Sequence, residues 1–345
     1  MNGAQRWRQF SLSPSKGERA GARGILFVIL CLCFRAPGST ITETFASNPL
    51  THGWRIFGQT NLFVWNSANQ NLSVTWDSSQ PNSYFYIPLG TILNRQDDFS
   101  MALDLQLSDI AGGVNPAKPF TFELAMGFLN SVNATETNFF RGNGSASPNL
   151  VEFDFFPDTG YGPTIWPALW STNSVLNFNG AWDYTILDLP VGVWMHITMT
   201  YTASNQTLST RITTNGVPIG AIGSVTNNPR FTDFRAGAFA IESYSDAAQN
   251  PQDSGSLLAH GIVDNLVITI PPPPIQMMAG KFVSNAWQVS FLNRTNWVYT
   301  LERSTNLQPW AVASATISGN GTNLTLYDSN AVPAKAFYRV RAERP

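Results

Sequence analysis

The sequence predicts an all-β protein, in which a two-sheet antiparallel jelly-roll sandwich is followed by a small second β-sandwich. Short runs of alternating apolar and polar residues recur along the chain, separated by turn residues. No stretch has the apolar periodicity of an amphipathic helix. Charged residues are only 12% of the chain and apolar residues 43%, which favours a well-packed extracellular β-protein over a disordered chain.

Residues 1–38 are predicted to be an export leader. A basic stretch precedes the apolar run 24–34, which is too short to span a bilayer and suits the core of a signal peptide. Cleavage is expected before Ser39. Both cysteines, Cys31 and Cys33, lie in the leader, so the mature chain is predicted to contain no disulfide. We expect export to the periplasm, the cell surface or the extracellular medium, without a membrane-spanning segment.

The region 39–270 carries enough short strand-like runs for a jelly roll, and too many for an immunoglobulin-sized domain. The clearest runs are 83–87, 99–107, 120–129, 194–201, 207–213, 236–243 and 261–270. The four prolines at 271–274 predict a stiff linker, because proline cannot continue a central strand. With 7 basic and 18 acidic residues, the stretch 39–274 has a net charge of −11, which argues against binding to nucleic acid.

The hairpin near the middle of the chain carries a resemblance. Residues 192–201 read GVWMHITMTY, and a complementary strand then leads to Asn215-Gly216. This pattern resembles the tryptophan hairpin of concanavalin A-like and laminin-G-like jelly rolls. The likeness extends over 41–270 and includes Gly53-Trp54 and 263–266 (VDNL), which fit bacterial members. Such folds carry lectins, glucanases, lyases and adhesive modules, so the resemblance implies a fold and leaves the activity open.

The region 275–345 carries a second resemblance through 299–307 (YTLERSTNL), Trp310 and 337–341 (FYRVR). These residues are similar to a small β-module at the C-termini of exported proteins from verrucomicrobia and their relatives. The likeness implies four to six short strands in a fibronectin-like sandwich. A spacing or surface-association role, or a purely structural one, would follow.

The most informative stretch is 151–158 (VEFDFFPD), where apolar and acidic residues alternate. The alternation predicts a strand whose Val151, Phe153 and Phe155 face the core. Glu152 and Asp154 should then lie side by side on the opposite, open face. Two exposed carboxylates in this arrangement suit a glycosidase acid pair or a site for calcium or sugar.

The glycosidase alternative rests on a likeness to laminarinase-type retaining enzymes, whose strand motif is Glu-x-Asp-x-Glu or Glu-x-Asp-x-x-Glu. Glu152 and Asp154 match the first two positions, the first of which is the nucleophile in that family. The acid/base position falls on Phe156 or Pro157, and neither side chain can transfer a proton. We therefore assign no catalytic residue and keep hydrolysis by Glu152 as the alternative.

The same stretch resembles the legume-lectin segment Val-Glu-Phe-Asp-x-Phe-x-Asn, which holds a transition metal and calcium. The resemblance implies a reduced calcium site at Asp154, the Phe156 carbonyl and Asp158, because calcium prefers oxygen ligands. Tyr161 and 163–165 stand where the family has a further Asp and a His, so a two-metal site is not expected. Pairing of the two strand carboxylates with hydroxyls, amides or an arginine fits the pattern equally well.

A second candidate for calcium is the pair Glu43 and Asp264, in the first and last strands of the predicted jelly roll. The two carboxylates should be neighbours if the ends of the jelly roll meet. A pair of solvated edge charges fits the same pattern.

Aromatic residues gather in the connection that follows Asp158. Rigid rings among Gly, Pro, Asn and Ser are surfaces on which sugar rings stack, and binding residues concentrate on such loops. We expect Trp182 to pack in the core. The candidate carbohydrate-binding residues are Glu152, Asp154, Tyr161, Trp166 and Trp170.

The sequence therefore predicts an exported, non-catalytic, lectin-like protein that binds a polysaccharide or glycan, with calcium as an optional cofactor. One alternative is a laminarinase-like glycoside hydrolase that uses Glu152. The other is a structural or adhesive cell-envelope protein without a small ligand. No glycine-rich phosphate loop indicates a nucleotide as ligand.

Overall fold

The computed structural model describes residues 39–111, 121–141, 147–177, 184–227, 231–246, 255–284, 286–328, 330 and 335–345. The chain divides into two compact units, one spanning Gly38–Pro271 and one containing Pro272–Pro345. The predicted leader, residues 1–38, lies outside the described residues. Among the residues that the structure describes, no helix is long and apolar enough to cross a membrane.

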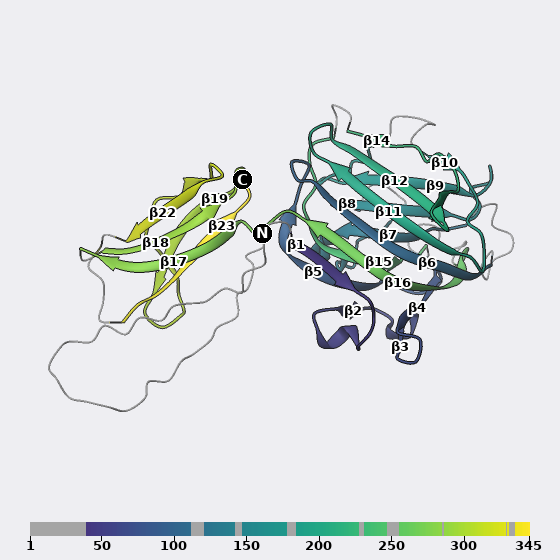
Figure 1. The fold of residues 1–345 in the computed structure, drawn as a ribbon, viewed down its shortest axis with the longest axis horizontal. Helices are drawn as coiled ribbons and strands as arrows, with labels where there is room; N and C mark the ends of the chain where they lie inside the picture. The colour runs from purple at the N-terminus through teal and green to yellow at the C-terminus, as the bar shows by residue number, and fades with distance from the viewer. Residues whose placement is uncertain are drawn as a thin grey trace. The chain divides into compact units, whose positions relative to one another are not determined.

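The first unit is a sandwich of two antiparallel sheets that lie face to face (Figure 1). Sheet A has the order β13 (Val217–Pro218), β12 (Thr207–Thr214), β11 (Trp194–Thr202), β6 (Phe99–Ala111), β16 (Leu258–Ile270), β4 (Asn71–Asp77) and β3 (Phe63–Asn66). At its margins β1 (Ser39–Glu43) pairs with β16, and β14 (Val225–Thr226) pairs with β12. Sheet B has the order β10 (Thr185–Ile186), β9 (Thr164–Trp170), β8 (Leu150–Phe156), β7 (Leu124–Leu129), β15 (Ala236–Ser243), β5 (Ser83–Leu93) and β2 (Arg55–Phe57). The predicted two-sheet sandwich is confirmed.

Helical structure in the described part of this unit is limited to short turns. These are α1 (Ser131–Ala134) and the 3-10 turns η1 (Pro49–Thr51) and η2 (Thr60–Leu62). The side chain of Asn130 caps α1 by accepting hydrogen bonds from the backbone of Val132 and Asn133.

The core between the two sheets follows directly from period-two alternation. In β6, every second residue from Phe99 to Leu107 is buried, whereas Ser100, Asp104 and the other intervening residues turn outward. In β8, Val151, Phe153 and Phe155 are fully buried toward this core, as the sequence predicts.

The outer face of sheet B is covered over its central strands β7 and β8 as well. A sheet with one open face exposes alternate residues, but β7 is buried at all six positions and β8 at six of seven. A second apolar cluster lies on this outer face, separate from the main core. Its members are Tyr84, Ala125, Leu129, Ala134, Phe139, Leu150, Ala168, Trp170, Ala238, Ala240 and Tyr244. The candidate residues of β8 therefore lie in an interior layer.

The second unit consists of two small antiparallel sheets. One contains β17 (Ile275–Val283), β18 (Ala286–Asn293) and β22 (Asn323–Asp328). The other is built around β19 (Val298–Ser304), which pairs with β20 (Ala311–Val312), β21 (Ile317–Ser318) and β23 (Phe337–Glu343). The described strands number seven rather than the expected four to six, because the two-residue strands β20 and β21 give no alternating pattern in the sequence.

Candidate functional site

Glu152 and Asp154 lie on the outer face of sheet B, on the side that the alternation of β8 predicts. Both side chains are nevertheless 0% exposed, so the expectation of an open, solvent-facing carboxylate pair is wrong. The physical reason is a stretch of chain between β7 and β8 that lies over this face. We call its described residues, 130–141 and 147–149, the cover segment.

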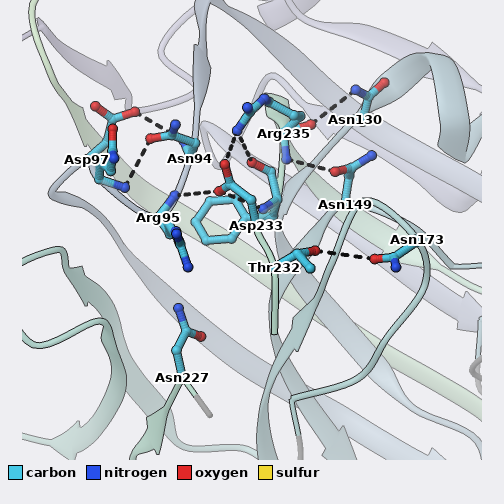
Figure 2. A network of polar contacts seen from close by, with 12 residues as sticks. Asn94, Arg95, Asp97, Asn130, Asn149, Asn173, Asn227, Thr232, Asp233 and Arg235 are labelled. Carbon is cyan, nitrogen blue, oxygen red and sulfur yellow. Dashed lines mark hydrogen bonds and ion pairs between the residues drawn. The ribbon is translucent and has the colours of Figure 1, made fainter. Parts of the chain in front are cut away.

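The two ends of the cover segment are fastened to one residue, Arg235, which precedes β15. The Asn130 amide donates to the Arg235 carbonyl over 3.0 Å, and the Arg235 backbone N–H donates to Oδ1 of Asn149 over 2.7 Å. The Asn130 N–H also donates to the Asn149 carbonyl over 3.2 Å. Figure 2 shows Asn130 and Asn149 next to one another, each bonded to the backbone of Arg235.

Neighbouring loops hold Arg235 in turn, as Figure 2 shows. The guanidinium of Arg235 donates to the carboxylate of Asp233, which also accepts a 3.1 Å hydrogen bond from the backbone of Arg95. The Thr232 hydroxyl donates to Asn173 over 3.3 Å. This network joins three loops, which precede β6, precede β15 and follow β9. Because Asn130 and Asn149 bind Arg235, both ends of the cover segment are connected to the same network.

The middle of the cover segment packs directly on the sheet. The hydroxyl of Tyr84 in β5 donates to the Ala134 carbonyl over 3.0 Å. The ring of Phe139 stacks on that of Tyr244, with centroids 6.3 Å apart. Arg141, two residues after Phe139, is buried between the cover segment and sheet B and is only 1% exposed.

Arg141 binds the carboxylates that the sequence singles out. Its Nε donates to Oε2 of Glu152 over 2.8 Å, and its Nη2 donates to Oδ2 of Asp154. Nε also lies 3.3 Å from Oε1 of Glu123, an ion pair without hydrogen-bond geometry. The guanidinium carbon is 5.2 Å from the ring centroid of Trp170, which adds a cation–π contact. The alternative in which these carboxylates pair with an arginine thus describes the structure.

Three carboxylates pair with this guanidinium, those of Glu123, Glu152 and Asp154, and the buried Glu242 lies close enough for the charge of Arg141 to act on it. We call these four acids the carboxylate cluster. The register places Ala125 between Asp154 and Glu242 on one cross-strand row, and all four acids are buried. Both oxygens of Glu123, both of Glu242 and Oδ1 of Asp154 have no hydrogen-bond donor among the described residues. Such a surplus of buried acid is costly unless protons or other positive charge neutralise it.

The excess of buried carboxylates over positive charge shifts the pKa values of several acids in the cluster. Burial raises the pKa of Glu123 from 4.5 to about 7, although Arg141 acts in the opposite direction. Burial, reinforced by the charge of Glu152, also raises the pKa of Glu242 well above its usual value, and burial raises that of Asp154. Burial lowers the pKa of Arg141, but the surrounding carboxylates outweigh that effect, so it stays protonated.

The geometry does not suit glycoside hydrolysis by Glu152. A nucleophile must reach the anomeric carbon, but Glu152 is fully buried and both of its oxygens accept hydrogen bonds, from Arg141 and Tyr244. Phe156, at the acid/base position, packs its ring 6.4 Å from that of Trp166.

The residues expected to hold calcium do not fit such an ion. Asp154 is bonded to the guanidinium of Arg141, whereas Asp158 is exposed beyond the end of β8. Oδ1 of Asp158 accepts a 2.7 Å hydrogen bond from the backbone of Gly160, and Phe156 between them is the last residue of the strand. Within the described residues, no group of three or more His, Cys, Asp or Glu side chains is arranged to hold a metal ion.

The second expected calcium pair is also not assembled. Strands β1 and β16 do pair, so the ends of the jelly roll meet as expected, but Glu43 is opposite Leu266 and turns inward. Its carboxylate accepts from the backbone of Phe45 and lies 2.7 Å from Nε2 of His52. Asp264 turns to the outer face of sheet A, because β16 bulges between Asp264 and Val267 and thereby changes the side on which its residues lie.

Apolar and aromatic side chains are exposed at the edge of sheet B that β8, β9 and β10 form. Tyr161, in the loop 157–163, is 88% exposed, and Trp166 and Phe156 are half-buried beside it on β9 and β8. Ile186 of β10 pairs with Thr164 and is exposed, and Tyr184 immediately precedes that strand. We call Phe156, Tyr161, Trp166, Tyr184 and Ile186 the aromatic edge.

The other two tryptophans considered from the sequence do not belong to this surface. Trp170 is only 2% exposed, because it lies beneath Arg141, so its expected role as an exposed sugar platform is wrong. Trp182 lies outside the described residues. The structure thus separates the candidates into a buried cluster around Asp154 and an exposed edge around Tyr161.

Sequence reasoning missed Arg141, Glu123, Glu242 and Tyr244. The positions of the two acids could have been predicted, because the alternation in the runs 120–129 and 236–243 places Glu123 and Glu242 on the outer face of their strands. Arg141 carried none, because it is a lone basic residue in a loop rich in Gly, Asn and Ser, and loop conformation cannot be read from periodicity.

A scan with protein-family models finds no match, and a search of curated proteins finds no relative. Similar solved structures are of the legume-lectin type. Peanut lectin with a nine-residue peptide is 12% identical, with 67% of this chain and 97% of that chain covered and a TM-score of 0.42. The acidic lectin of winged bean, complexed with methyl-α-D-galactose, is 11% identical, with 68% and 98% covered and a TM-score of 0.42. The luminal domain of VIP36, bound to Ca²⁺ and Man3GlcNAc, is 11% identical, with 66% and 86% covered and a TM-score of 0.38.

Proposed function

We propose that the jelly roll is a non-catalytic carbohydrate-binding module that binds a polysaccharide at the aromatic edge. The observation that carries the proposal is the exposure of Tyr161 in the loop that joins β8 to β9, the strands of Phe156 and Trp166, on a sheet whose central strands β7 and β8 are covered on both faces. Aromatic faces offer apolar area at low entropic cost, which suits stacking against the C–H faces of sugar rings.

The loop beside the aromatic edge supplies polar groups for the hydroxyls of a sugar. The carboxylate of Asp158 is exposed, and the Thr159 and Thr164 hydroxyls lie 3.3 Å apart at the base of the loop. Gly160 and Gly162 have positive φ angles of 80° and 111°, a conformation that glycine adopts without strain and that presents Tyr161 outward. A few directed polar groups next to rings are typical of ligand sites.

The charge of the module indicates the class of polysaccharide. With a net charge of −11 over 39–274, it would repel an acidic polymer, so we propose a neutral glycan such as a β-glucan. The binding requires no cation at Asp154, whose charge Arg141 already balances. Export through the leader 1–38 would bring the protein to such a ligand.

Affinity electrophoresis through gels that contain neutral polysaccharides tests the proposal. We expect at least one neutral polysaccharide to retard the protein, and Tyr161→Ala to weaken the affinity about tenfold, or 1.4 kcal/mol. Tyr327→Ala is the matched control, because Tyr327 is 53% exposed but lies on β22 in the second unit. Equal retardation of the wild type and Tyr161→Ala would reject binding at the aromatic edge. Retardation by no polysaccharide would favour the structural or adhesive alternative.

A further inference from the structure

The guanidinium of Arg141 binds acidic groups from two separate parts of the chain. Arg141 of the cover segment bonds Glu152 and Asp154 of β8 and lies 3.3 Å from Glu123, just before β7. Several carboxylates that converge on one buried positive charge form the arrangement that a divalent cation usually creates in proteins. Here the charge is part of the chain.

Arg141 is enclosed by protein on all sides, as a buried metal ion would be. The residue is 1% exposed, and its guanidinium lies over the rings of Trp170 at 5.2 Å and Tyr244 at 6.0 Å. The two rings contact the guanidinium through their faces, while the carboxylates of Glu152 and Asp154 accept its hydrogen bonds. Even so, acceptors outnumber the single positive charge, because Glu242 and Glu123 have no hydrogen-bond donor among the described residues.

The covalent connection of this charge makes it hard to displace. The cover segment is fastened at both ends to Arg235, through Asn130 and Asn149. A group tethered in this way acts at a high effective concentration, so a free ion at millimolar concentration competes poorly with it.

We propose that the guanidinium of Arg141 takes the place of a divalent cation in the carboxylate cluster, which makes the jelly roll independent of metal and locks the cover segment onto sheet B. This inference concerns the interior of the module and does not rest on the proposed glycan site. Its prediction is that removal of the guanidinium converts the cluster into a cation site.

The first arm of the test uses the wild-type protein. Its melting temperature should stay the same in EDTA and after addition of millimolar Ca²⁺, since a ligand stabilises only a state that it binds. It should also give no Tb³⁺ luminescence on excitation of tryptophan. A melting temperature that falls in EDTA and returns with Ca²⁺ would overturn the proposal, because the wild type would then contain a metal centre.

The second arm uses Arg141→Met, which keeps an unbranched apolar chain about as long as the aliphatic part of arginine and removes the charged guanidinium. We expect the melting temperature to fall by about 10 °C, because breaking a buried ion pair leaves unpaired carboxylates. Millimolar Ca²⁺ should restore part of that loss, and Tb³⁺ should luminesce through Trp170, whose ring centroid lies 5.2 Å from the guanidinium carbon of Arg141. Loss of stability without any response to Ca²⁺ or Tb³⁺ would overturn the proposal.

Arg235→Met is the matched control, since the Arg235 side chain pairs with Asp233 outside the carboxylate cluster. It should gain no Tb³⁺ signal. If Arg141→Met does not fold, Arg141→Lys replaces it and should fold with a lower melting temperature and no response to Ca²⁺, because the ammonium keeps the charge. A Tb³⁺ signal from Arg141→Lys equal to that from Arg235→Met supports the proposal, and a larger one contradicts it.

Discussion

The hydroxyl of Tyr244, the residue that follows β15, donates a hydrogen bond to Oε1 of Glu152 in β8, although β7 lies between β15 and β8. The bond reaches over β7 because the outward positions of that strand near it are Ala125 and Gly127. Replacement of these residues by larger ones would separate the two groups. The cluster therefore depends on small residues in the intervening strand as well as on its charged members.

Tyr244→Phe should lower the free energy of unfolding by about 1–3 kcal/mol, because it leaves an oxygen of Glu152 buried without its donor. Urea denaturation at neutral pH measures this change. Tyr161→Phe is the control and should leave the stability unchanged, since Tyr161 is 88% exposed. Equal stability of the two variants would show that the Tyr244 hydroxyl contributes nothing.

Gly127→Ala should destabilise the jelly roll by about 1–3 kcal/mol through overpacking. A Cβ at Gly127 would lie 2.3 Å from the Val151 carbonyl oxygen and 2.8 Å from the Glu152 Cα, and neither backbone atom can yield easily. Gly237→Ala is a suitable comparison, because its Cβ would meet only the flexible end of Ile92 at 2.9 Å. Thermal melts should rank Gly127→Ala well below Gly237→Ala, and the reverse order would contradict the close approach of β7 and β8.

The stability contributed by Glu123 should fall as the pH rises from about 4.5 to 7. Below about pH 4.5 the Glu123 carboxyl is protonated in the folded and in the unfolded protein. Between about pH 4.5 and 7 it loses its proton in the unfolded protein only, because burial raises its pKa in the folded protein to about 7. At about pH 8 the loss amounts to about 3 kcal/mol. Glu123→Gln should therefore match the wild type in acid and exceed it in stability at about pH 8. A constant difference across the pH range would contradict this account.

Glu242→Gln should also stabilise the protein at about pH 8 and have little effect in acid. Burial and the nearby Glu152 raise the pKa of Glu242, so its ionised form is unfavourable in the fold at alkaline pH. Glu136→Gln in the cover segment is the control, because Glu136 is exposed. Melting curves at the two pH values measure the effect, and destabilisation by Glu242→Gln at about pH 8 would indicate that the carboxylate has a partner.

The sequence was sufficient to predict the sandwich and the face on which each residue of β8 lies, because period two decides both. It was not sufficient to predict whether that face is open. This depends on the cover segment, where Arg141 and Phe139 belong to a loop without periodicity. Likewise, the bulge between Asp264 and Val267 separates Asp264 from Glu43, and no alternation reveals a bulge of this kind.

The most direct test of the central claim compares Tyr161→Ala with Glu152→Gln by affinity electrophoresis on a neutral polysaccharide that retards the wild type. Binding at the aromatic edge predicts that Tyr161→Ala weakens the retardation, whereas Glu152→Gln keeps it in full, because Glu152 is buried and bonded to Arg141. Loss of retardation in Glu152→Gln with full retardation in Tyr161→Ala would contradict the claim and place the ligand at the carboxylate cluster.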